Sequence, residues 1–207
     1  MTNMDFNNAE PQRGFGDLIP DNTIALVVAK LRPGGAGPGG WLKASATGCD
    51  MMDLEFVVDG GEFDRRKFWG LFVTSGCTEG HEKAANITRS RLRAMLESAH
   101  GINAGDNSQA ALAKRQVSGW GAFDGLKFCA KIGIEQGGLK DKSAGPASER
   151  YTDKNVLKAA LTPDDTGYIN PGPQAANAAG NASAGPASGP APAAATGTAS
   201  AKPNWAQ

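Results

Sequence analysis

The clearest strand pattern in the chain is Leu126-Lys-Phe-Cys-Ala-Lys-Ile-Gly-Ile134. Successive side chains of a β-strand point to opposite faces of a sheet, so residues two apart share a face. Here the even positions from Leu126 to Ile134 are apolar, whereas Lys127 and Lys131 lie between them. This alternation predicts a strand with one buried face and one face in water.

Four other segments have strand character: residues 23–32, 51–58, 65–73 and 155–161. The first of them is rich in β-branched side chains and ends at Pro33. In the second of them the even positions are apolar, which places Asp53 and Glu55 on the outward face. The dipeptide Asp59-Gly60 that follows predicts a hairpin into the third strand.

A helix is predicted between the third and fourth strands, over residues 82–99. Its apolar side chains recur at spacings of three and four residues and therefore form one stripe, and Gly101 follows as a natural end. A second short helix is predicted around residues 109–115. The stripe consists of Ala84, Thr88, Leu92, Met95, Leu96 and Ala99.

Three strands, a helix and two further strands follow one another in the order of an OB-fold, a small Greek-key barrel. We therefore predict a mainly β domain with one main helix. Its expected form is an OB-fold-like five-stranded barrel with the helix between strands three and four. The sequence does not fix the closure of the barrel, and short all-β or α+β arrangements stay open as alternatives.

The composition of the chain changes near residue 165. Every Asp and Glu lies at or before Asp165, and the residues beyond are mostly Ala, Gly, Pro, Ser, Thr and Asn. Such a segment buries too little apolar surface to offset the entropy of ordering its backbone. We predict a domain over residues 1–165, a disordered linker over 166–201 and a terminal peptide over 202–207. In that peptide Trp205 is a candidate anchor for a partner.

The 207 residues include 21 Lys and Arg against 21 Asp and Glu, so the formal net charge is zero. This balance excludes a polybasic protein that binds polyanions by bulk charge, although it permits a local basic strip. The polar first eight residues do not resemble a signal peptide, and the longest apolar run, residues 24–29, is far shorter than the ~20 residues of a membrane span. The scattered Cys49, Cys77 and Cys129 predict reduced thiols. We therefore expect a cytoplasmic protein.

The sequence gives no positive case for catalysis. Its two histidines are His81 and His100, and Cys77 with His81 offers two ligands where a structural zinc site takes four. The glycine-rich loop at residues 34–40 lacks the Gly-Lys-Ser/Thr ending of a phosphate-binding loop. We therefore expect neither an enzyme nor a bound metal or cofactor.

Basic and aromatic residues alternate in the third predicted strand. Arg65, Lys67 and Trp69 share one face there. Cations that follow the phosphates, beside a ring that stacks on a base, are what single-stranded nucleic acid requires. Lys127 and Lys131 would add charge from the outer face of the fourth strand.

Two loops flank the binding face of an OB-fold. Here they would carry Trp41 and Lys43 between strands one and two, and Lys140 and Lys142 between strands four and five. The candidate DNA-binding residues are therefore Trp41, Lys43, Arg65, Lys67, Trp69, Lys127, Lys131, Lys140 and Lys142.

Other observations weigh against such a face. Trp69 is equally compatible with the core, because its strand is apolar on both faces near its end. The outward Asp53 and Glu55 would repel phosphate. Lys30 and Arg32 rank lower as candidates, because their even numbers align them with the inward series of the second strand.

Five stretches of the chain carry a resemblance to a known family. They are Asp5-Phe-Asn-Asn-Ala-Glu-Pro-Gln12, Asp17-Leu-Ile-Pro-Asp-Asn-Thr-Ile-Ala25, Arg66-Lys-Phe-Trp69, Ser90-Arg-Leu-Arg-Ala-Met-Leu-Glu-Ser98 and Phe128-Cys-Ala-Lys-Ile-Gly-Ile134. Together they resemble an uncharacterised family of bacteriophage and prophage proteins, over about residues 4–163. The chain departs from the family pattern at Asn22, where glycine is common.

The resemblance implies a phage replication or recombination accessory, similar to single-stranded DNA-binding proteins and located in the host-cell cytoplasm. Bacterial members of that wider class end in an acidic peptide, whereas residues 203–207 contain no acidic side chain. The resemblance therefore favours a dedicated phage partner over a host protein that reads acidic tips.

Our leading interpretation is a sequence-tolerant single-stranded DNA-binding protein that coats and protects exposed strands. The alternative is an OB-like adaptor that contacts a phage recombinase, helicase or nuclease and has no affinity for DNA. A metal-dependent nuclease and a virion component are weaker alternatives. A homo-oligomer, formed through an unpaired strand edge or residues 103–123, is compatible with each of them.

Overall fold

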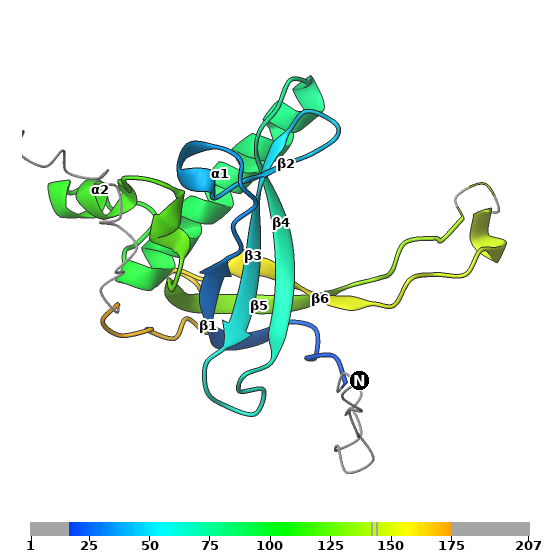
Figure 1. Cartoon of the computed structure of the whole chain (residues 1–207). Helices are drawn as coiled ribbons and strands as arrows, with labels where there is room; N and C mark the ends of the chain where they lie inside the picture. Colours follow the sequence, from blue (N-terminus) through cyan, green and yellow to red (C-terminus); the bar gives the residue numbers. More distant parts are fainter. Residues whose placement is uncertain (1–16, 142, 144, 175–207) are drawn as a thin grey trace, which may run out of the picture.

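The computed structural model describes residues 17–141, 143 and 145–174. Within them it is mainly β, with six antiparallel strands in one sheet and two α-helices (Figure 1). Three short 3-10 turns lie at Pro38–Gly40, Trp120–Phe123 and Gly145–Ala147. The main elements are β1 (Thr23–Leu31), β2 (Lys43–Ala44), β3 (Asp50–Val58), β4 (Lys67–Ser75), α1 (Glu79–His100), α2 (Gln109–Arg115), β5 (Lys127–Glu135) and β6 (Lys154–Ala160).

The mainly β class is confirmed, and each predicted strand lies within a few residues of an observed one. The two-residue strand β2 adds a sixth, because a segment so short carries no alternation to detect. The described strands form an open sheet with the order β2–β3–β1–β5–β6, and β4 also pairs with β3. Strands β4 and β6 contact each other without a shared ladder among the described residues, so no closed five-stranded barrel is formed.

Strand β1 occupies the centre of this sheet. Its residues 27–31 pair with β3, and its residues 23–28 pair with β5. The β3–β4 pair and the β5–β6 pair therefore diverge from opposite edges of one strand, and they run across each other in Figure 1.

The core lies between the sheet and α1, which contacts β4, β5 and β6. Phe56 of β3 stacks on Phe68 of β4, with ring centroids 5.0 Å apart, and meets the edge of Phe128 of β5 at 6.0 Å. Leu92 and Met95 of α1 pack into the same cluster. Aromatic rings of three strands thus meet at one point, and they add contact energy to that of burial alone.

Helix α1 begins and ends at specific capping residues. The Thr78 hydroxyl accepts a hydrogen bond from the main-chain N–H of His81, and Gly101 follows the helix with φ +63°. The left-handed conformation at that position favours glycine, as the sequence analysis predicts. The predicted apolar stripe is buried, except that Ala85 is buried where Ala84 is half-buried.

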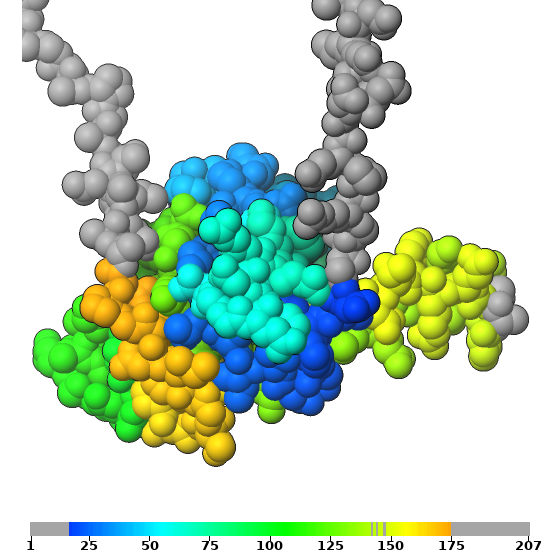
Figure 2. Space-filling view, turned by 90° about the horizontal axis from the view of Figure 1, so that it is seen from below, coloured from blue at the N-terminus to red at the C-terminus, as the bar shows by residue number. Residues whose placement is uncertain are grey.

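Two segments extend the domain beyond the sheet. The connection between β5 and β6, residues 136–153, forms an arm that stands clear of the body in Figure 2. Residues 161–174 instead pack back on the domain, where the Tyr168 hydroxyl donates to the Ser98 carbonyl at 2.9 Å. This segment, which we name the strap, includes residues 166–174 of the predicted linker.

None of the helices in the described ranges is long and apolar enough to cross a membrane. All three cysteines are free; Cys49 and Cys129 are buried, whereas Cys77 is exposed.

Glu97 is a buried charge where α1 meets α2, with 3 % of its surface exposed. Its Oε1 accepts from Nε of Arg93 at 2.8 Å and from Nε of Arg115 at 2.7 Å. Arg115 also donates to the carbonyl oxygens of Asn103 and Asp106. Its guanidinium therefore neutralises a buried carboxylate and holds the connection between the helices in place.

We expect Arg115→Met to lower the free energy of unfolding by about 3 kcal/mol, because it leaves the buried Glu97 carboxylate with one cationic partner. The matched control is Lys83→Met, which breaks the exposed ion pair of Lys83 with Glu79 at 2.7 Å and should cost at most about 0.5 kcal/mol. Urea unfolding followed by circular dichroism measures both changes. Equal losses would contradict a special role of the Glu97 cluster.

Candidate nucleic-acid interface

The outer face of β3 and β4 carries the exposed aromatic residue of the predicted site. Trp69 lies opposite Glu55 and Leu71 opposite Asp53 in the antiparallel register. The side chain of Phe68, the residue before Trp69, is buried, whereas Trp69 is 44 % and Leu71 60 % exposed. Trp69 is therefore a surface residue, which decides between the two placements that the sequence allows.

Strand β1 adds two cations to this face. Lys30 lies opposite Glu55, and Arg32 follows the end of the strand. The sequence interpretation that aligned Lys30 and Arg32 with the inward series is wrong, because in β1 the odd positions are the buried ones. Val27 and Ala29 are fully buried in the core, so their even-numbered neighbours point outward.

Asp53 joins the cations of two elements. Its Oδ2 lies 2.5 Å from Nζ of Lys43 in β2 and 3.7 Å from a guanidinium nitrogen of Arg32. Asp53 is only 4 % exposed, because the two longer side chains cover it. Their positive charges compensate the charge of its carboxylate.

Glu55 lies two residues along β3 from Asp53, about 7 Å away on the same face. Its carboxylate accepts from Nζ of Lys67 at 2.9 Å and from the indole Nε1 of Trp69 at 3.2 Å. The hydrogen bond from Lys67 is the main cause that lowers the pKa of Glu55, and the Trp69 bond and the charge of Lys30 act in the same direction. Glu55 is therefore charged at neutral pH.

Together these residues form what we name the cationic face. Four cations surround two carboxylates, so the face has an excess of positive charge although the whole chain has none. Its apolar part is formed by Trp69 and Leu71, which occupy adjacent outward positions of β4. The cationic face consists of Lys30, Arg32, Lys43, Asp53, Glu55, Lys67, Trp69 and Leu71.

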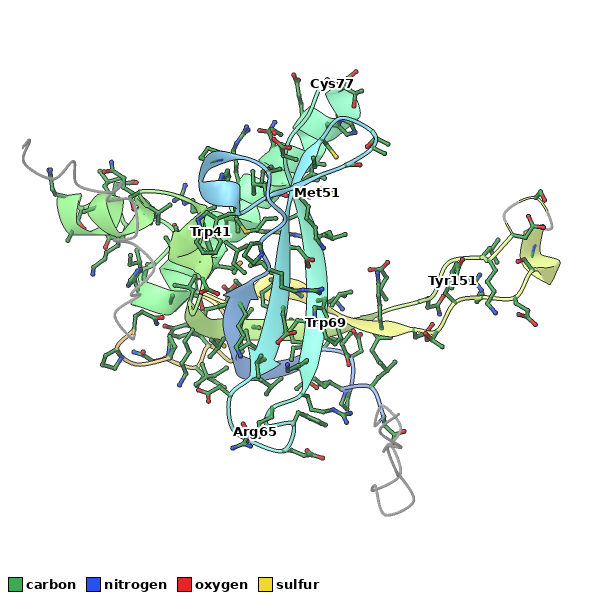
Figure 3. All side chains as sticks on the ribbon, in the orientation of Figure 1. Trp41, Met51, Arg65, Trp69, Cys77 and Tyr151 are labelled. Atoms are coloured by element: carbon green, nitrogen blue, oxygen red, sulfur yellow. The ribbon has the colours of Figure 1, made fainter. Side chains whose placement is uncertain are left out.

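Two predicted site residues have other roles in the structure. Arg65 does not share a strand face with Lys67 and Trp69: it lies in the turn before β4 at φ +63°, and its side chain is 91 % exposed beside Asp64. Trp41 is half-buried against the core, and its ring lies against the backbone of Gly121. Figure 3 shows Trp41, Trp69 and Arg65 well apart.

The lysines of β5 lie on the same outer face of the sheet as Lys30, at different distances from it. Lys127 lies opposite Val28, one outward position along β1 from Lys30, and pairs with Asp59 at 2.5 Å, whereas Lys131 lies opposite Ile24 near the other end of β1. Between them Cys129 points away from the main core, but it is fully buried because the strap covers it; the Ile169 N–H donates to its sulfur at 3.3 Å. The outer face of β5 is therefore continuous with that of β1, and the strap covers part of it between the two lysines.

The arm carries the remaining described candidate. Lys140 pairs with Glu149 across the arm at 2.8 Å, and Tyr151 lies nearer its base with 61 % of its surface exposed (Figure 3). Lys142 and Trp205 lie outside the described residues.

Among the residues that the structure describes, no three His, Cys, Asp or Glu side chains are grouped so as to hold a metal ion. Comparison of the chain with protein-family models, with curated proteins and with solved structures finds no match. The chemistry of the cationic face is therefore the basis on which a function is inferred.

The exposure of Trp69 is directly testable. We expect Trp69→Ala to lower the free energy of unfolding by about 1–2 kcal/mol, because the residue is 44 % exposed and the change removes one exposed hydrogen bond and part of the burial of an aromatic side chain. The neighbouring Phe68→Ala should cost about 3–5 kcal/mol, because that ring is buried in the aromatic cluster. Urea unfolding measures both, and a loss at Trp69 as large as that at Phe68 would place Trp69 in the core.

Proposed function

We propose that this protein binds single-stranded DNA through the cationic face, with little dependence on base sequence. The observation that carries the proposal is Trp69, an exposed indole on an open strand face, with Lys67 two residues before it and Lys30 across β3 on the far side of Glu55. Stacking of a base on an aromatic side chain is worth about 1–3 kcal/mol and is possible for every base. The surrounding cations would follow the phosphates of the strand.

We also propose that the sheet is OB-like and partly open. Among the five long strands, β3 and β4 are second and third, and α1 follows the third. Oligonucleotides bind the second and third strands of OB-folds, between the loop after the first strand and the loop after the fourth. The corresponding segments here are residues 32–49 and the arm, which lie on opposite sides of Trp69 in Figure 3.

In this proposal the protein coats and protects single strands during replication or recombination. The resemblance to phage proteins supports that role and the host-cell cytoplasm as its location. Trp205, which lies outside the described residues, remains our candidate for docking a replication or recombination partner.

The proposal predicts that the full chain raises the fluorescence anisotropy of a labelled oligo-dT strand. Trp69→Ala should weaken this binding by about 1–3 kcal/mol through loss of stacking, while circular dichroism shows a retained fold. A variant that binds as tightly as the natural protein would remove Trp69 from the site.

Electrostatics provides an independent test of which face binds. Lys30→Gln should weaken binding and make the slope of log K against log salt shallower by about 0.7, the value for one phosphate contact to a single strand. The matched control is Lys131→Gln, the same change on the outer face of β5, which should leave affinity and slope unchanged. An equal effect of both changes would show that the strand also crosses β5.

The adaptor function is favoured by one observation, the partly exposed carboxylate of Glu55 within the cationic face. Glu55, the more exposed of the two carboxylates there, matches a cation of a protein partner as well as it opposes phosphate. Absence of binding to oligo-dT even at low salt would exclude the DNA-binding function and leave the adaptor in its place.

A further inference from the structure

Glu55 holds the donors that a bound strand would need. Its two carboxylate oxygens accept from Lys67 and from Trp69, and Lys30 lies opposite on β1. A phosphate oxygen seeks the same donors, an ammonium group and an indole N–H. We propose that Glu55 is an internal competitor of the DNA phosphate, displaced from Lys67 when a strand binds and restored when it leaves. This inference rests on the proposed DNA-binding function.

The exposure of the pair permits such an exchange. The side chain of Glu55 is 17 % exposed and that of Lys67 is 48 % exposed, so water reaches the ion pair. Exposed ion pairs contribute little to stability, and Lys67 can turn from the carboxylate to a phosphate above it without disturbing the core.

Asp53 has a different role, although it lies on the same strand face. Its side chain is only 6 % exposed, beneath Lys43 and Arg32. These two cations come from opposite ends of the loop between β1 and β2, so the carboxylate ties that loop to β3. We therefore assign Asp53 to positioning the cations and Glu55 to competing with the ligand.

The competitor has a consequence for salt dependence. When phosphate displaces Glu55, the freed carboxylate attracts a cation from solution, which offsets one counterion released from the DNA. Removal of the Glu55 charge should therefore strengthen binding and also increase its dependence on salt.

The test is Glu55→Gln in the full chain, titrated into labelled oligo-dT at several salt concentrations. We expect affinity to rise by about 1.5- to fivefold, the range of an exposed ion pair. The slope of log K against log salt should become steeper by about 0.7. Glutamine retains an acceptor for Trp69, and circular dichroism verifies the fold.

Two controls separate local competition from bulk charge. Glu79→Gln removes the same charge from an exposed ion pair on α1 and should leave affinity unchanged. In a Lys67→Gln background, Glu55→Gln should lose most of its gain, because the cation for which it competes is absent. Asp53→Asn, in contrast, should weaken binding.

The outcomes distinguish this inference from the function on which it rests. Binding by the natural protein, with Glu55→Gln equal or weaker, would overturn the competitor and leave the DNA-binding function intact. A gain of the same size from Glu79→Gln would also overturn it, since bulk charge would then explain the effect. Absence of binding by the natural protein and by Glu55→Gln alike would overturn both.

Discussion

The backbone ladders of β1 are the constraint on which the rest of the structure depends. One strand pairs with β3 along one edge and with β5 along the other. Because every residue of β1 must point to one face or the other, the burial of Val27 and Ala29 fixes Lys30 on the outer face. The same ladders bring Lys30 opposite Glu55, so the arrangement of the core also determines the arrangement of charge on the cationic face.

A chain without net charge thus separates its charges locally. On the cationic face, cations from β1, β2 and β4 meet two carboxylates of β3, one buried and one accessible. The buried Asp53 keeps the cations in place, and the accessible Glu55 moderates their attraction for an anion. A face built in this way favours a ligand that binds and leaves readily over one held permanently, because three of its cations already have a carboxylate partner before an anionic ligand arrives.

Most of the fold could be predicted from the sequence, because strands and helices with one buried face have a visible period. The alternation at residues 126–134 and the stripe from Thr88 to Ala99 identify β5 and α1 within a few residues. The site was harder to predict. In the sequence Arg65 lies two residues before Lys67 and so shares its predicted strand face. In the structure it has a left-handed backbone conformation in the turn before β4, where the alternation of the strand has not yet begun.

The faces of different strands also cannot be compared by residue number. At the end of β1 the charged side chains of Lys30 and Arg32 indicate that the even positions face outward. The sequence interpretation missed this signal because it applied to β1 the rule of β3, in which the even positions face inward. The distances of Lys127 and Lys131 from the cationic face have no local signal, because they depend on the register of β5 against β1.

The strap has a practical consequence for dissecting the chain. Gln174 donates to the carbonyls of Ala99 and Lys127, and it accepts from the Lys127 N–H. A fragment trimmed at the compositional boundary after Asp165 would lose these bonds and uncover the thiol of Cys129. Such a fragment would expose a second thiol, beside the already exposed Cys77, to oxidation and intermolecular cross-linking. Aggregation of the fragment would then result from the choice of its end point. Proteolytic or recombinant domains should therefore end beyond Gln174.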